Sequence, residues 1–81
     1  MPHLEDNKTT TGEKKKGVTL KGVTGQQYGR GGSVTVKSGN ETRNEIMREG
    51  TNRLIELNDG KAGKYSVSNR SGGKIDYTWK S

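Results

Sequence analysis

Apolar and polar residues alternate along several short segments of this chain. The alternation is clearest over residues 74–80, in which polar residues separate Ile75, Tyr77 and Trp79. Successive side chains of a β-strand point to opposite faces, so this period of two predicts a strand with one buried and one exposed face. The same pattern predicts four more strands, over residues 17–22, 33–38, 53–58 and 64–69.

Residues 41–49 are the one segment with a helical signature. Thr42 and Glu45 have the spacing of a capping box, and Gly50 suits the position after the last helical turn. A short helix is therefore predicted between the second and third strands, with an irregular loop as the alternative.

Glycine-rich segments connect the predicted strands. Residues 25–32 are typical of a flexible loop, whereas residues 59–63 and 70–73 are short enough to be turns between neighbouring strands. Three strands joined by such turns favour an antiparallel meander at the C-terminal end. The second turn should then bring Lys64 and Lys74 close together on adjacent strands.

The N-terminal segment carries little that could be buried. Residues 1–16 contain a threonine triplet and several charged residues, but Leu4 is their only large aliphatic residue. A disordered tail is predicted for residues 1–16, followed by a single small β-domain over residues 17–81. Removal of the tail should leave the stability of that domain unchanged.

Together these elements predict a mainly all-β fold. The strands would form a small five-stranded antiparallel open barrel or sandwich. The predicted core consists of the apolar residues on the inward faces and in the possible helix: Val18, Leu20, Val34, Val36, Ile46, Ile55, Leu57, Tyr65, Val67, Ile75, Tyr77 and Trp79. Leu54 falls on the opposite face of its strand, where it would be either covered or part of a surface patch.

Composition limits how stable such a domain can be. Only 23% of the 81 residues are hydrophobic, 13 are glycine, and phenylalanine and cysteine do not occur. This leaves little apolar area to offset the entropy lost on folding, and disulfides cannot add to it. Stabilisation through self-association or a protein partner is therefore considered. Since His3 is the only histidine, neither a structural metal nor a cofactor is expected.

Targeting signals are not apparent in the sequence. No segment approaches the roughly 20 apolar residues of a membrane-spanning helix, and the N-terminus has no apolar stretch typical of a signal peptide. A cytoplasmic location is expected, with a secreted or virion-associated protein as the alternatives.

An enzymatic activity is not expected. A serine nucleophile needs a nearby base, and His3 lies in the predicted tail. The carboxylates at positions 41, 45 and 49 alternate with arginines, which is typical of a solvated surface. The glycines over residues 29–32 lack the spacing of a phosphate-binding loop.

Charge gives the strongest functional indication. The formal net charge is +6, and the first two and last two predicted strands are basic, whereas residues 41–60 are acidic. A basic sheet face beside a glycine-rich loop suits a phosphate backbone. Tyr28 and Arg30 lie in the loop within the order Tyr-Gly-Arg-Gly-Gly, which is typical of segments that contact single strands through charge and stacking.

Two functional hypotheses follow. The first is a non-enzymatic module that binds nucleic acid or another polyanion through the following residues: Lys21, Tyr28, Arg30, Lys37, Lys61, Lys64, Arg70 and Lys74. The alternative is a structural or protein-interaction module, such as a small virion, assembly or cell-surface component, stabilised by association. The C-terminal aromatic residues could form a stacking platform for bases. Because phenylalanine does not occur, their burial in the core is favoured.

Overall fold

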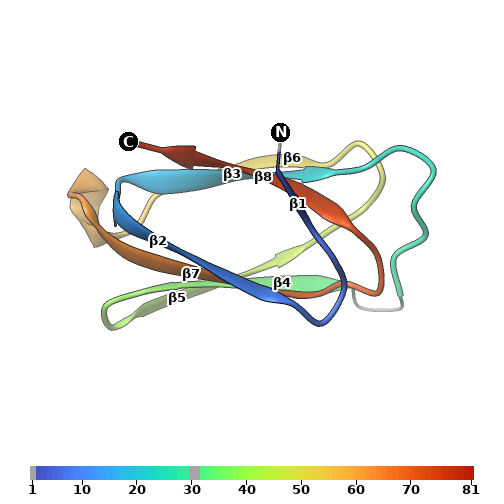
Figure 1. Cartoon of the computed structure of the whole chain (residues 1–81), viewed down its shortest axis with the longest axis horizontal. Helices are drawn as coiled ribbons and strands as arrows, with labels where there is room; N and C mark the ends of the chain where they lie inside the picture. The colour runs from blue at the N-terminus through green and yellow to red at the C-terminus, as the bar shows by residue number, and fades with distance from the viewer. Residues whose placement is uncertain (1, 30–31) are drawn as a thin grey trace.

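Two four-stranded antiparallel β-sheets pack face to face in the computed structural model, which describes residues 2–29 and 32–81 (Figure 1). Sheet A contains, in spatial order, β1 (His3–Leu4), β8 (Ile75–Lys80), β3 (Gly17–Gly22) and β6 (Asn52–Ile55). Sheet B contains β2 (Thr9–Lys15), β7 (Gly63–Arg70), β4 (Ser33–Ser38) and β5 (Glu41–Ile46). A short 3₁₀ turn, η1 (Asn58–Gly60), precedes β7.

The strand pairing is that of one long hairpin rolled up on itself. The first strand pairs with the last, β2 with β7, β3 with β6, and β4 with β5. Contacts of β3 with β8 and of β4 with β7 join these pairs into the two sheets. This is the strand order of a jelly roll. The prediction of a mainly β, antiparallel fold is confirmed, but the described residues form eight strands where the sequence pattern predicted five.

Alternation along the strands builds the core between the sheets. The inward-facing side chains of β3, β4 and β7 are almost completely buried, as their period of two predicts. The buried apolar residues are Leu4, Val18, Leu20, Val34, Val36, Met47, Ile55, Leu57, Tyr65, Val67 and Ile75. Tyr77 and Trp79 are half-buried against this cluster. Leu54 lies on the surface with 53% of its area exposed.

The N-terminal segment is part of the fold, contrary to the prediction of a disordered tail over residues 1–16. Leu4 pairs with Ile75 at the edge of sheet A and is only 6% exposed. β2 then runs along β7, with Thr10 opposite Val67. The segment is ordered by backbone pairing to strands that are 48 or more residues away. Its low apolar content gave no sign of this pairing.

Residues 41–46 form a strand instead of the predicted helix. Gly39 has a φ of 60°, which suits the first central residue of a two-residue hairpin turn, and Ser38 pairs with Glu41 on either side of it. The hairpin sets Ile46 opposite Ser33 on the outer surface, where it is 49% exposed. Met47 is buried in its place. A helix this short would be only marginally stable alone. As a strand, the same segment gains a ladder of backbone hydrogen bonds to β4.

The predicted C-terminal meander is also not present. β6, β7 and β8 lie alternately in sheets A, B and A, so the glycine-rich turns between them carry the chain from one sheet to the other. At the end of β7, beside the second turn, buried Asn69 donates hydrogen bonds to the carbonyl oxygens of Leu4 and Gly73, each at 2.8 Å. Ser71 donates to the Asn69 side-chain oxygen at 2.6 Å. This satisfied polar network fixes a crossover that a simple hairpin turn would not make.

Candidate functional site

The outer face of sheet B is an array of hydroxyl groups. Two rows of side chains cross all four strands at right angles to them. One row is Thr9, Ser68, Thr35 and Asn44, and the other is Thr11, Ser66, Lys37 and Thr42. Neighbouring strands lie about 4.8 Å apart, and alternate residues on one strand about 6.7 Å apart, so the array is closely and regularly spaced. We call these eight residues, together with Ser33 and Arg70, the hydroxyl face.

Hydrogen bonds within the hydroxyl face orient several of its side chains. The hydroxyl oxygens of Thr9 and Ser68 lie 3.0 Å apart, and the Thr35 hydroxyl donates to the Asn44 side-chain oxygen at 2.8 Å. A hydroxyl group can both donate and accept, so each retains capacity for a ligand. The face therefore offers many polar contacts in fixed positions.

Three of the predicted cationic residues lie on this side of the molecule. Lys37 lies between Ser66 and Thr42 within a row, and Arg70 lies opposite Ser33 on β4. Lys64 extends the outward-facing series of β7 at the other end. Among the strand residues described for this outer surface, Glu13 is the only carboxylate, and it lies 3.8 Å from the Lys64 amine. Both groups are largely exposed, so this ion pair neutralises Lys64 only weakly.

Lys61 lies near the same end. It is exposed in the segment between η1 and β7, three residues before Lys64. This segment is not part of the sheet, so Lys61 flanks the hydroxyl face without belonging to it.

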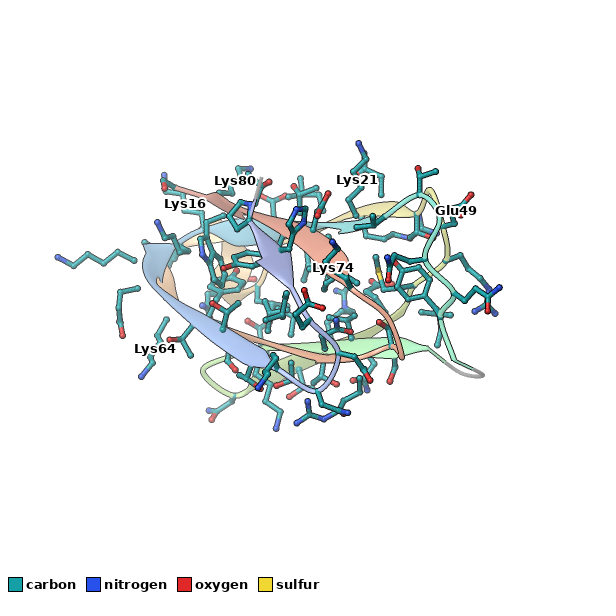
Figure 2. The ribbon with its side chains drawn as sticks, turned by 45° about the vertical axis from the view of Figure 1, so that its right-hand side comes forward. Lys16, Lys21, Glu49, Lys64, Lys74 and Lys80 are labelled. Carbon is teal, nitrogen blue, oxygen red and sulfur yellow. The ribbon has the colours of Figure 1, made fainter. Side chains whose placement is uncertain are left out.

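Two other predicted cations belong to the opposite sheet. Lys21 on β3 lies opposite Asp76 on β8, and Lys74 directly precedes β8. Figure 2 shows these two lysines near the upper sheet, whereas Lys64 projects from the lower left. Asp76 also contacts the His3 side chain. The outer surface of sheet A thus carries charges of both signs.

Lys80, another cation of sheet A, is also paired with a carboxylate. The Lys80 amine lies 2.5 Å from a carboxylate oxygen of Glu56. The two side chains flank Gly17, which lies opposite Lys80 and has no side chain to separate them. Lys80 is therefore less available to an external anion than Lys37 or Arg70.

The expected proximity of Lys64 and Lys74 is wrong. Lys64 is on β7 in sheet B, and Lys74 leads into β8 in sheet A, and these two strands do not pair. The turn over residues 70–73 carries the chain across the sandwich, so it separates the two lysines. A like-charge pair across a hairpin therefore cannot be an indication of an anionic partner.

Tyr28 holds a loop in place and is not a free stacking residue. Its hydroxyl accepts a hydrogen bond from the Val23 backbone N–H and donates one to the Lys74 carbonyl oxygen, both at 2.8 Å. Burial of the ring raises the pKa of Tyr28 above its ordinary value, and the carboxylates of Asp76 and Glu49 act in the same direction. The hydrogen bond from Val23 acts against this rise. Arg30 lies outside the described residues.

The C-terminal aromatic side chains face inward. Tyr65 is buried, and its ring lies edge-on to that of Trp79, with 6.4 Å between the ring centres. Tyr77 and Trp79 make a similar contact at 5.6 Å. The Trp79 ring covers Gly12 so closely that a Cβ atom there would lie 2.8 Å from it. These residues pack as core, which agrees with the interpretation favoured from composition.

Sequence reasoning missed the hydroxyl residues of this face. The sequence pattern places Thr9 and Thr11 in a tail, and Thr42 and Asn44 in a helix. The available signals were the run of threonines at Thr9-Thr10-Thr11, a β-branched residue type that favours strands, and the alternation of hydroxyl residues in Tyr65-Ser66-Val67-Ser68. These signals indicate a polar surface only once the pairing of the four strands is known, because the pairing aligns the residues in rows.

Pockets and clusters of metal ligands are both absent from the described residues. No pocket is found among residues 2–29 and 32–81. Over the same part of the chain, no three metal-binding side chains come together. None of the elements there is a helix of the length and apolar character needed to cross a membrane.

The chain was compared with models of protein families, with curated proteins and with solved structures, and none of these comparisons gave a match.

Proposed function

We propose that this protein is a non-enzymatic binding module for nucleic acid or another polyanion, and that it contacts its ligand through the hydroxyl face. The observation that carries the proposal is the composition of that face. Lys37 and Arg70 lie among regularly spaced hydroxyl groups, with Lys64 at one end and Glu13 as the single carboxylate described there. Such a surface favours anions over cations.

Phosphate and sulfate groups suit this surface chemically. Their oxygens accept hydrogen bonds from hydroxyl groups, and their charge is neutralised by lysine and arginine. An open array without a pocket supports contact with an extended ligand, in which each anionic group meets a similar local environment. Contacts of this kind position a backbone without reading a sequence. We therefore expect binding with little preference among sequences.

The proposal predicts a specific effect of charge on this face. The double variant Lys37→Gln and Arg70→Gln should bind labelled single-stranded DNA and RNA, duplex DNA and dextran sulfate more weakly than the parent. On a plot of log affinity against log salt concentration for duplex DNA, the slope should become shallower by about two contacts. Fluorescence anisotropy over a salt series measures both quantities.

A matched control removes the same charge from the other sheet. The double variant Lys21→Gln and Lys74→Gln has an equal net charge, but both changes lie on the side of sheet A. It should retain most of the affinity and most of the salt slope. Equal losses in the two double variants would show that only net charge matters, which would contradict the hydroxyl face as the site. If the parent protein did not bind any of these polyanions at low salt, the proposal would be wrong, and the structural-module hypothesis would remain.

A further inference from the structure

The two sheets have four edge strands, and three of them are protected against pairing with another chain. An exposed edge presents unpaired backbone groups, and proteins block such edges with short strands, bulges or lysines. β1 has two residues and β6 has four. The pairing of β2 is irregular between Gly12 and Lys15, and Lys14 there has a φ of 54°.

β5 has neither a short length nor irregular pairing. Its charged residues, Glu41, Arg43 and Glu45, oppose strand addition only where the added strand does not match their charges. It has six residues that pair with β4 in unbroken register from Glu41 to Ile46. It contains neither proline nor lysine, and the described residues place no strand on its outer side. The exposed side chain of Ile46 lies at its end. β5 is therefore the edge of this molecule most open to strand addition.

The register of β5 determines which backbone groups point outward. The Met47 N–H donates to the carbonyl oxygen of Gly32, the residue before β4, at 2.8 Å, so the backbone groups of Met47 point toward β4. Backbone groups alternate in direction along a strand. Residues 41, 43 and 45 therefore bond to β4, and the backbone groups of Thr42, Asn44 and Ile46 point outward.

These three outward residues fit a second copy of the same strand in one register. If Asn44 lies opposite the partner's Asn44, then Thr42 lies opposite the partner's Ile46, and all three outward residues on each chain find partners. In that register Arg43 lies opposite the partner's Glu45, and by symmetry Glu45 lies opposite the partner's Arg43. Both ion pairs fall at positions without backbone bonds, where opposing side chains are closest.

The charges also disfavour the neighbouring registers. A shift of two residues in one direction places Arg43 opposite the partner's Arg43, and a shift in the other places Glu45 opposite the partner's Glu45. Like charges directly opposite each other destabilise a strand pair. The charge pattern of β5 therefore selects the same register as its backbone.

We propose that the protein forms a two-fold symmetric dimer in which β5 pairs antiparallel with β5 of a second copy. Sheet B then continues across both molecules, and the exposed Ile46 packs beside Thr42 of the partner subunit. The contact is smaller than a standard protein interface, so the association is weak and concentration-dependent. This inference does not depend on polyanion binding, because it uses only the edge of sheet B.

Sedimentation velocity over a concentration series of the full chain tests the dimer. The single variants Arg43→Glu and Glu45→Arg should each weaken dimerisation about tenfold or more, because each converts two attractive pairs into repulsive ones. The double variant with both changes should restore it, since the opposite charges again face each other. Within each chain the Arg43 guanidinium lies 3.8 Å from a carboxylate oxygen of Glu45, and the double variant also preserves this local ion pair.

A second variant tests the symmetry axis. Asn44→Asp keeps the oxygen that accepts the Thr35 hydrogen bond, but it places two carboxylates opposite each other in the dimer. It should weaken dimerisation about tenfold and leave the thermal stability of the monomer unchanged. The control is Asn52→Asp, the same change at an exposed position on the edge strand β6, which should dimerise like the parent.

The proposal fails if the parent protein remains monomeric at millimolar concentration. It also fails if Asn44→Asp and the two charge-reversal variants dimerise as strongly as the parent, because another surface would then be responsible. If both single variants lose dimer affinity and the double variant recovers it, the proposed register is established.

Discussion

At the scale of single residues, polar side chains fasten the loops of this protein to its sheets. The Tyr65 hydroxyl accepts a hydrogen bond from the Leu57 N–H at 2.7 Å and lies 3.1 Å from the Lys16 carbonyl oxygen, which it can reach as a donor. Tyr28 makes the corresponding contacts at the opposite end of the molecule, and Asn69 makes them at the crossover into β8. In a chain with few large apolar residues, these bonds hold segments that burial alone would not fix.

We predict that Tyr28→Phe destabilises the protein by about 1–3 kcal/mol at neutral pH, because it leaves the Val23 N–H and the Lys74 carbonyl without their partner. The loss should shrink as the pH rises above about 10. The pKa of Tyr28 is raised in the folded protein, so its contribution is complete below the unfolded pKa and disappears as the pH passes the folded pKa. Urea unfolding of both proteins from pH 7 into the alkaline range measures the difference.

Tyr77→Phe is the control for this prediction. The Tyr77 hydroxyl has one long contact, at 3.4 Å from the Thr10 hydroxyl, so its removal should cost less. If Tyr28→Phe were as stable as the parent at neutral pH, the hydroxyl of Tyr28 would not be what holds the loop.

At the scale of elements, every strand except β5 pairs with a strand that is distant in the sequence. β1 and β2 cover the edges of β8 and β7, and both belong to the first sixteen residues. β5 is a strand because a turn at Gly39 folds it back onto β4. Local sequence determined which face of each strand is apolar, but pairing decided whether weak segments became strands.

We predict that a protein consisting of residues 17–81 does not fold. Without β1 and β2, the paired edges of β8 and β7 and part of the core would be exposed to solvent. A domain of this size has too small a free energy of unfolding to tolerate this loss. Circular dichroism and amide NMR dispersion of the truncated protein test this. A shift in unfolding free energy of less than about 0.5 kcal/mol would show that the tail is dispensable after all.

A point substitution separates the contribution of β1 from that of the whole segment. In the full chain, Leu4→Ala should cost about 2–4 kcal/mol, because Leu4 is buried beside Ile75. Urea unfolding measures this cost even if the truncated protein cannot be studied.

At the scale of the whole molecule, the rolled hairpin implies an order of assembly. The pair β4–β5 is local, with two residues between its strands, whereas β1 and β8 lie at opposite ends of the chain. Closing longer loops costs more entropy, so pairing that begins at the Gly39 turn and spreads outward avoids the largest initial cost. We infer that the β4–β5 hairpin belongs to the folding nucleus.

This order predicts different kinetic effects for two similar glycines. Gly39 and Gly60 both have positive φ, of 60° and 79°, and an alanine Cβ would meet no close contact at either position. Each alanine variant should lose about 1 kcal/mol through backbone strain. Gly39→Ala should mainly slow folding, and Gly60→Ala should mainly speed unfolding, as stopped-flow measurements over a urea series would show. The reverse assignment of these two effects would exclude the hairpin as nucleus.

The sequence by itself determined the class of fold, most of the core and the places of five strands, although β6 ends at Ile55 where the pattern predicted a strand as far as residue 58. Val18, Leu20, Val34, Val36 and Val67 are buried as their spacing predicts, because the direction of a side chain on a strand depends only on local backbone geometry. The basic character of the chain was equally evident, since formal charge depends on composition alone.

Tertiary structure alone decided which strands are neighbours, and with them the candidate site. Thr9, Ser68, Thr35 and Asn44 form a row only because four strands from distant parts of the chain pair in one register. For the same reason, five of the predicted cations divide between the two sheets, with Lys37, Lys64 and Arg70 on sheet B and Lys21 and Lys74 on the side of sheet A. Strand pairing depends on contacts between segments that each have several possible partners, and a period of two does not distinguish among them.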